Sequence, residues 1–342
     1  MVQPANRVIQ LTRFGGPEGL QIVETPVPSP GPGEVRVRVL ASSINYTEVL
    51  IRRHLYPQTA ARQLPFVMGY DVIGEVDQLG PGVGEFKVGD RVADLTVVGS
   101  NADYRILRAG DLTPVPKDID PAEAATLILS WMTACQLLHR SAHVKPGQRV
   151  LVHGAAGAVG QALLVLGKLA GVTMWGGAHG KHAALIHDLG ATPIDYDWED
   201  FTRVLPGGFD VVCDGIGEDG YRRSFAALKP GGLLVAIGYS ASVQAKQGML
   251  SILTSIARLY LWRFLPGGKR ARFYSINAMR AQHPDWFKED LEHLFTLLRA
   301  RSIHPRVAER ISLEEVADAH RRLEAGGLEG KIVLCPNPTF AC

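Results

Sequence analysis

The sequence of 342 residues predicts an α/β fold in two parts, a β-rich, barrel-like domain and a doubly wound parallel sheet. Up to about residue 116, short apolar stretches are separated by Gly and Pro turns, the pattern of a small antiparallel domain. From residue 150 onward, apolar strands alternate with helical segments, the order typical of a parallel sheet. The second part begins with RVLVHGAAGAVGQALLVLGKLAG (residues 149–171), which predicts a strand, a glycine turn and a helix.

The first part supplies two clear strands and then two helices. Residues 35–39 alternate valine with arginine, which predicts a half-buried strand, and a second strand is expected over residues 69–76. Helices are expected over residues 121–129 and 132–142.

The second part and the end of the chain add further elements. Strands are expected over residues 150–152, 172–175, 210–213, 233–237 and 331–334. Helices are expected over residues 181–189, 221–228, 285–299 and within 312–326, where Ser312 begins a capping box with Glu315.

Composition excludes several classes of protein. A net charge of +2 without a basic tract argues against nucleic acid as a partner. The four cysteines include no C-x-x-C pair, which argues against a disulfide framework or a structural zinc site and favours a reducing compartment. The N-terminus lacks the pattern of a signal peptide, and no apolar run reaches the length of a membrane span. We therefore expect a cytoplasmic protein.

Residues 249–265 (MLSILTSIARLYLWRFL) are apolar and aromatic but carry two arginines. Three interpretations stay open: a helix that covers a substrate cleft or a subunit interface, an interfacial membrane anchor, and a plain core helix.

The glycine turn after residue 152 predicts a dinucleotide-binding site. Its glycines follow a buried strand and precede a helix, the context of the G-x-G-x-x-G fingerprint, although alanine stands at the first position. A small residue still permits the tight turn, and the backbone can approach a pyrophosphate at the helix N-terminus. The residues expected to contact the cofactor here are Ala155, Gly157, Ala158, Val159 and Gly160.

The residues after the second strand of this sheet favour NADPH over NADH. NAD-binding proteins place an acidic residue about 20 positions after the glycine turn, where it bonds to the ribose hydroxyls. Between Gly160 and His187 there is no acidic residue. The segment WGGAHGKH instead supplies His179 and Lys181, which predict a positively charged site for a 2′-phosphate without an opposing carboxylate.

Several stretches, in this order, resemble the medium-chain dehydrogenase/reductase superfamily and its zinc-independent quinone oxidoreductase-like branch. They are SSINYTEVLIRRHLYP, PFVMGYDVIGEV, VGDRV, WMTACQLL, VLVHGAAGAVGQAL, IDYDWEDF, VVCDGIG and EGKIVL. The resemblance implies a GroES-like β-barrel domain over residues 1–127, completed by 286–342, and a Rossmann domain over 128–285 that binds NADPH. It also implies a homodimer, paired through the sheet edge near residues 232–238.

The same resemblance assigns candidate site residues. The positions of the catalytic zinc ligands in zinc-dependent relatives fall at Asn45 and Tyr70, which are not usual zinc ligands, so we expect no metal. In the resembled family the residues at Lys181 and Tyr196 contact the 2′-phosphate. Further cofactor contacts are expected at Asn45, Thr133, His179, Gly238 and Lys331. Asn45, Tyr46 and Tyr56 are the candidates for contact with the nicotinamide or the substrate carbonyl, and a tyrosine could donate the proton.

Together these residues predict an enzyme that reduces a quinone or an α,β-unsaturated carbonyl compound with NADPH, because hydride addition to a polarised C=C bond needs hydrogen-bond donors rather than a metal. Two alternatives stay open. One is an enoyl-thioester reductase of a fatty-acid or polyketide pathway, for which Arg52, Arg53 and Arg62 could attract a carrier protein. The other is a non-catalytic NADPH-binding relative of the lens or vesicle type.

Overall fold

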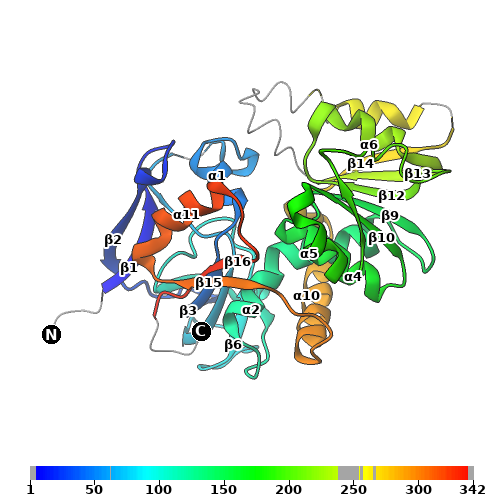
Figure 1. Ribbon diagram of the computed structural model, residues 1–342. Helices are drawn as coiled ribbons and strands as arrows, with labels where there is room; N and C mark the ends of the chain where they lie inside the picture. Colours follow the sequence, from blue (N-terminus) through cyan, green and yellow to red (C-terminus); the bar gives the residue numbers. More distant parts are fainter. Residues whose placement is uncertain (1–4, 62, 238–253, 255–256, 265–266, 338–342) are drawn as a thin grey trace. The chain divides into compact units, whose positions relative to one another are not determined.

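A computed structural model of the protein describes residues 5–61, 63–237, 254, 257–264 and 267–337 (Figure 1). The chain divides into two compact units. The first unit comprises Met1–Leu129 and Lys288–Cys342, and the second unit comprises Ser130–Phe287. The catalytic and cofactor-binding roles that the sequence assigns to the two parts stay predictions.

Two sheets build the first unit. One has the strand order β2-β1-β4, and the larger has the order β15-β16-β3-β5-β6-β8, with β7 also paired to β3. Its strands are β1 (Ala5–Leu11), β2 (Leu20–Pro26), β3 (Glu34–Ser43), β4 (Phe66–Val67), β5 (Val72–Leu79), β6 (Arg91–Asp94), β7 (Tyr104–Arg108), β8 (Thr113–Pro114), β15 (Val307–Ile311) and β16 (Lys331–Leu334). In β3 the side chains of Val35, Val37 and Val39 are buried and the arginines between them are half-buried, so the predicted alternation is confirmed.

The end of the chain returns to the first unit. β16 pairs antiparallel with β3, through Val333 opposite Ser43, and helix α11 (Val316–Ala325) lies beside β2 (Figure 1). The predicted capping box is confirmed, because Glu315 accepts a hydrogen bond from the Ser312 N–H at 2.8 Å. The other helices of this part are α1 (Tyr46–Arg52), α2 (Pro121–Thr126) and α10 (Pro284–Arg299).

The second unit is a parallel sheet of the order β11-β10-β9-β12-β13-β14. Its strands are β9 (Arg149–His153), β10 (Thr173–Ala178), β11 (Thr192–Asp195), β12 (Phe209–Asp214), β13 (Leu228–Ala236) and β14 (Arg270–Phe273). Its helices are α3 (Met132–Cys135), α4 (Ala158–Leu169), α5 (Ala183–Asp188), α6 (Arg222–Ala226) and α9 (Ile276–Gln282). From β9 the chain first adds strands on one side of the sheet (β10, β11) and then on the other (β12, β13, β14). The carboxyl end of β9 therefore lies at the switch point, where such sheets bind ligands. The predicted doubly wound parallel sheet is confirmed.

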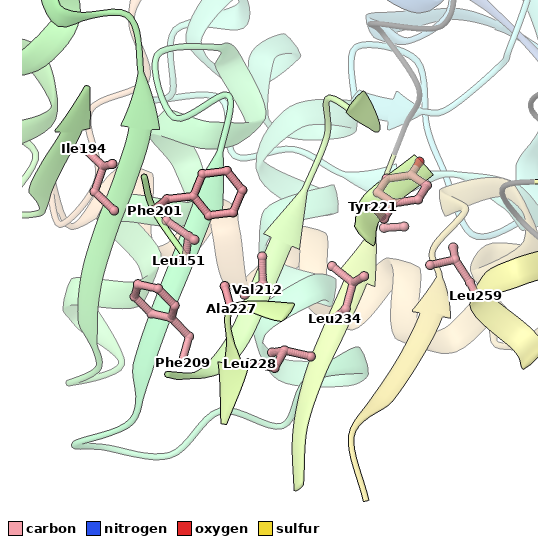
Figure 2. Close-up of a cluster of buried hydrophobic side chains, with 11 residues drawn as sticks. Leu151, Ile194, Phe201, Phe209, Val212, Tyr221, Ala227, Leu228, Leu234 and Leu259 are labelled. Carbon is pink, nitrogen blue, oxygen red and sulfur yellow. The ribbon is translucent and has the colours of Figure 1, made fainter. Parts of the chain in front are cut away.

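An apolar cluster of side chains holds this sheet together. Leu151, Val212 and Leu234 come from three adjacent strands, and Phe209 and Tyr221 pack with them (Figure 2). Each of these side chains is at most 3% exposed, so the cluster fixes the strand ends from which the site loops emerge.

Two details differ from the expectations. The helix expected over residues 221–228 ends at Ala226, and the segment KPGG belongs to β13, where the pairing register with β12 shifts. β14 pairs with the other side of β13. Because β13 is hydrogen-bonded on both sides, residues 232–237 do not form a free edge through which a dimer could pair. The edge strand of the described sheet is β14.

Residues 249–253, 255–256 and 265 of the segment 249–265 lie outside the described residues, as does Gly238. Of its described part, Leu259 is fully buried in the apolar cluster, which favours the core-helix interpretation for that turn. Tyr260, Leu261 and Phe264 are exposed. In the part of the chain that the structure describes, no helix has the length and hydropathy needed to cross a bilayer.

Candidate cofactor and catalytic sites

The glycine turn at the end of β9 has the geometry that a pyrophosphate site requires. Gly154 has a φ of 73°, and a Cβ at Gly160 would lie 2.3 Å from the Gly154 carbonyl oxygen. Only glycine permits this approach of helix α4 to the strand. Ala155 fits at the first fingerprint position because its methyl group faces Gly176, where a Cβ would lie 2.9 Å away. Gly157 precedes the first turn of α4, and the backbone N–H groups there favour an anion.

Tyr196 reaches from the end of β11 to this turn. Its hydroxyl accepts a hydrogen bond from the Gly154 N–H at 3.1 Å and lies 2.7 Å from His153 Nδ1. Its ring covers Gly177, where a Cβ would lie 2.5 Å from it. The structure thus brings Tyr196 to the glycine turn, and the expected contact with a 2′-phosphate stays a prediction. His153 was not among the sequence candidates, although it stands directly before Gly154.

The region after β10 holds carboxylates that the sequence analysis did not foresee. His179 Nδ1 lies 3.1 Å from Asp197, and a Cβ at Gly180 would lie 2.2 Å from the Asp195 carboxylate. Lys181 is exposed in the turn that follows. We call His179, Lys181, Asp195 and Asp197 the surface cluster. The expectation of a 2′-phosphate site without an opposing carboxylate is wrong, since two carboxylates lie here. They belong to β11 and to the residues that follow it, beside Tyr196.

In the first unit, Asn45 lies in a buried polar network. Its side-chain nitrogen donates to the Ser43 carbonyl at 2.7 Å and to the Asp71 carboxylate at 2.9 Å. Its side-chain oxygen accepts a hydrogen bond from the Lys331 ammonium. An amide NH₂ group has two hydrogens, and both have acceptors here. The geometry thus favours a structural role for the Asn45 amide over donation to a substrate.

Glu48 and Asn101 extend this network. Glu48 accepts from the Asn45 backbone N–H at 2.9 Å and from the Asn101 side-chain nitrogen at 3.0 Å. We call the whole set the buried cluster: Ser43, Asn45, Glu48, Asp71, Asn101 and Lys331. Sequence reasoning found Asn45 and Lys331 but missed the two carboxylates, whose only signal was their position beside Asn45 and Tyr70.

Burial shifts the proton affinities of the charged members. It raises the pKa of Glu48 to about 8, and the nearby Asp71 carboxylate acts in the same direction. It also raises the pKa of Asp71 and lowers the pKa of the Lys331 ammonium, each opposed by the attraction between these two groups. The Lys331 ammonium thus attracts both buried carboxyl groups, and its expected contact with the cofactor stays a prediction.

Tyr56 lies beside Tyr70. Their hydroxyl oxygens are 2.5 Å apart and their rings meet edge to face at 5.9 Å. Tyr70 is fully buried, whereas Tyr56 and Tyr46 are half-buried. The Tyr56 hydroxyl therefore has a buried hydrogen-bond partner in Tyr70, while the Tyr56 side chain is itself partly exposed. Tyr46 opens helix α1, and its catalytic role stays a prediction.

The two positions that would hold zinc in zinc-dependent relatives carry the amide of Asn45 and the phenol of Tyr70, both tied into hydrogen bonds. Among the described residues, no group of three or more His, Cys, Asp or Glu side chains is arranged to hold a metal ion.

Thr133 lies in α3 of the second unit and is 4% exposed. Its expected contact with the cofactor stays a prediction, as do the contacts expected at the glycine turn. The structure thus brings the site candidates together in three groups: the buried cluster and the tyrosine pair in the first unit, and the glycine turn with the surface cluster in the second.

The chain is similar to several known proteins. Residues 31–117 match the family described as "Alcohol dehydrogenase GroES-like domain", and residues 189–334 match "Zinc-binding dehydrogenase". The chain is 33% identical to a quinone oxidoreductase of Pseudomonas aeruginosa, over 96% of this chain and 99% of the relative. It is 32% identical to a 2-haloacrylate reductase of a Burkholderia species, over 94% and 96%. A mycobacterial protein solved in complex with NADPH superposes with a TM-score of 0.81, at 29% identity over 97% of this chain and 100% of that one.

Proposed function

Since the chain belongs to the medium-chain dehydrogenase/reductase superfamily, in its zinc-independent quinone oxidoreductase-like branch, we propose that it reduces a quinone or an α,β-unsaturated carbonyl compound with NADPH. The observation that carries the proposal is the pairing of Tyr56 with Tyr70, which puts a hydrogen-bonded phenol where zinc-dependent relatives would hold a metal ligand. The names of the two curated relatives support an active reductase over the non-catalytic alternative.

The second unit suits a nicotinamide dinucleotide. Gly157, Ala158 and Val159 would face the pyrophosphate at the start of α4, and Gly160 permits the close packing that the site needs. When bound, this cofactor supplies the hydride.

The residues of the first unit would supply the proton and the positioning. As negative charge develops on the carbonyl oxygen of the substrate, the Tyr56 hydroxyl donates a hydrogen bond to it and then the proton. Asn45 acts indirectly: its amide, fixed by Lys331 and Asp71, holds the loop that begins α1. We therefore reassign Asn45 from substrate contact to positioning.

We propose NADPH as the preferred cofactor because Lys181 offers a positive charge, and His179 a ring nitrogen that can bond to a phosphate, after the end of β10. The carboxylates of Asp195 and Asp197 oppose the binding of a 2′-phosphate. They reduce the preference for NADPH over NADH that the sequence alone predicts. Apparent affinities for NADPH and NADH, measured by fluorescence titration, test the preference, and tighter binding of NADH would refute it.

The function itself is tested with purified protein, NADPH and a panel of substrates: a simple quinone, a free enone, the matching enoyl thioester and a saturated ketone. We expect rapid oxidation of NADPH with the quinone or the enone, no effect of a chelator, and little turnover of the saturated ketone. A strong preference for the thioester would favour the enoyl-thioester reductase. Tight NADPH binding without any turnover would favour the non-catalytic alternative.

The variant Tyr56→Phe tests the proton donor. We expect kcat to fall about 10- to 100-fold, the effect of removing one general acid or one hydrogen bond to a developing charge. The KM for NADPH should stay unchanged. The variant Tyr104→Phe serves as the matched control, because Tyr104 lies on β7 with Arg36 over its ring.

A cytoplasmic location and a homodimer complete the proposal. Light scattering of the purified protein measures the dimer, and substitution of alternate residues of β14 by proline tests whether that edge forms it.

A further inference from the structure

We propose that Tyr70 is a positioning residue that keeps the Tyr56 hydroxyl directed at the substrate and stabilises the phenolate that Tyr56 becomes. The inference rests on the proposed function and deepens it, since it names the group through which Tyr56 acts. It assigns a task to a position that in zinc-dependent relatives would hold the metal.

The two phenols are not equivalent. Tyr70 is 0% exposed, and its hydroxyl lies 2.5 Å from that of Tyr56, which is half-buried. The buried Tyr70 hydroxyl is suited to hydrogen-bond the Tyr56 hydroxyl. The Tyr56 side chain, which is partly exposed, is the better placed of the two to contact a substrate. The edge-to-face contact of the rings, at 5.9 Å and 70°, limits the rotation of both side chains.

The backbone around Tyr70 is held on both sides. A Cβ at Gly69 would lie 2.2 Å from the Asn101 nitrogen, so this residue must be glycine for the chain to pass. The Tyr70 carbonyl accepts hydrogen bonds from the Thr96 and Val97 N–H groups, at 2.9 and 3.0 Å.

Val97 has a φ of 66°, an unfavourable conformation for a β-branched residue. Strain of this kind persists where the surroundings enforce it, and here it accompanies the fixing of Tyr70. The backbone that carries the Tyr70 ring is therefore held in place by the close approach at Gly69 and by two hydrogen bonds to the Tyr70 carbonyl.

In the step that Tyr70 supports, the β-carbon would take a hydride from NADPH, whose C–H bond breaks as it is oxidised to NADP⁺. The C=C π pair shifts to the bond between the α-carbon and the carbonyl carbon, and the C=O π pair moves to the oxygen, which gives an enolate. The O–H bond of Tyr56 then breaks and its proton passes to the substrate, while the Tyr70 hydroxyl donates to the phenolate oxygen. Water reprotonates Tyr56, and Tyr70 keeps its own proton throughout.

A double-mutant cycle tests this dependence. Wild type, Tyr70→Phe, Tyr56→Phe and the double variant are compared in NADPH oxidation with an enone, together with the solvent isotope effect on kcat. We expect Tyr70→Phe to lower kcat about tenfold, the loss of one hydrogen bond to a charged group, with the KM for NADPH unchanged. In the Tyr56→Phe background, the same change should have almost no effect, because its target is gone. The solvent isotope effect should rise in Tyr70→Phe as proton transfer becomes slower.

Several outcomes would overturn the proposal. Equal losses in both backgrounds would mean that Tyr70 acts through packing alone, and an unchanged kcat in Tyr70→Phe would remove its role entirely. If Tyr70→Phe does not fold, Tyr70→Met replaces it, since methionine also lacks a donor and fills a similar space. The variant Tyr104→Phe is the matched control. A wild-type protein that oxidises no NADPH with any quinone or enone would instead overturn the proposed function, which makes the two failures distinguishable.

Discussion

The buried cluster of the first unit and the surface cluster of the second unit use similar side chains for different purposes. Asn45, Glu48 and Asp71 are at most 2% exposed, and each has hydrogen-bond partners within the protein. His179 and Asp197 are 67% and 51% exposed, so water and salt screen their interaction. Charged groups inside the first unit therefore fix its geometry, whereas those on the surface of the second unit stay accessible to a ligand.

Loss of the buried cation should have the largest effect on stability. Lys331→Met leaves the Asp71 carboxyl group buried without its counter-ion, and such a loss costs about 3–5 kcal/mol. Urea unfolding measures the change in the free energy of unfolding.

The exposed pair of Arg321 with Asp318, at 3.8 Å, supplies the matched control. Arg321→Met should cost less than about 1 kcal/mol, because exposed ion pairs contribute little. Similar losses in both variants would contradict the distinction between the two kinds of charge.

The next largest effect is a dependence of the free energy of unfolding on pH, caused by His320. It is fully buried on α11, its ring nitrogens have no hydrogen-bond partner among the described residues, and burial, with Arg52 nearby, lowers its pKa from 6.5 to about 3. Below pH 6.5 the unfolded chain binds a proton that the folded chain does not, so stability is lost as the pH falls toward 3. At about pH 5 the loss should be about 2 kcal/mol.

His320→Leu should remove this part of the pH dependence. Thermal unfolding of wild type and variant between neutral and mildly acidic pH measures it. Parallel curves for the two proteins would show that His320 does not titrate with unfolding.

The smallest effect is expected at the surface cluster. Asp197→Asn removes one exposed negative charge beside His179, so NADPH should bind about two- to fivefold more tightly, while NADH should change less. Fluorescence titration with both cofactors measures the difference. An equal change for both would place Asp197 away from the 2′-phosphate.

Local patterns in the sequence predicted most of the fold. The valine alternation in β3 and the capping box at Ser312 depend on residues close in the chain, and both are confirmed. The edge strand β14 escaped prediction because RARF has no strong strand pattern, and its place follows only from pairing with β13. The start of β13 was missed because KPGG signals a turn, whereas here it forms an irregularity within the strand.

The site could be predicted only in part. Asn45 and Lys331 are 286 residues apart, and only the return of β16 to β3 brings them together. The spacing of these residues in the sequence does not show that Asn45 donates to Asp71, or that the Lys331 ammonium attracts this carboxylate. Likewise, Asp195 and Asp197 lie beside Gly180 and His179 because β11 pairs with β10.

We propose that cofactor binding and proton donation depend on different residues, Lys181 in the second unit and Tyr56 in the first. Equilibrium titration of NADPH against wild type, Lys181→Ala and Tyr56→Phe tests it most directly. We predict about tenfold weaker NADPH binding in Lys181→Ala, with NADH binding unchanged, and no change in Tyr56→Phe. Unchanged NADPH affinity in Lys181→Ala, or a loss in Tyr56→Phe, would contradict the claim.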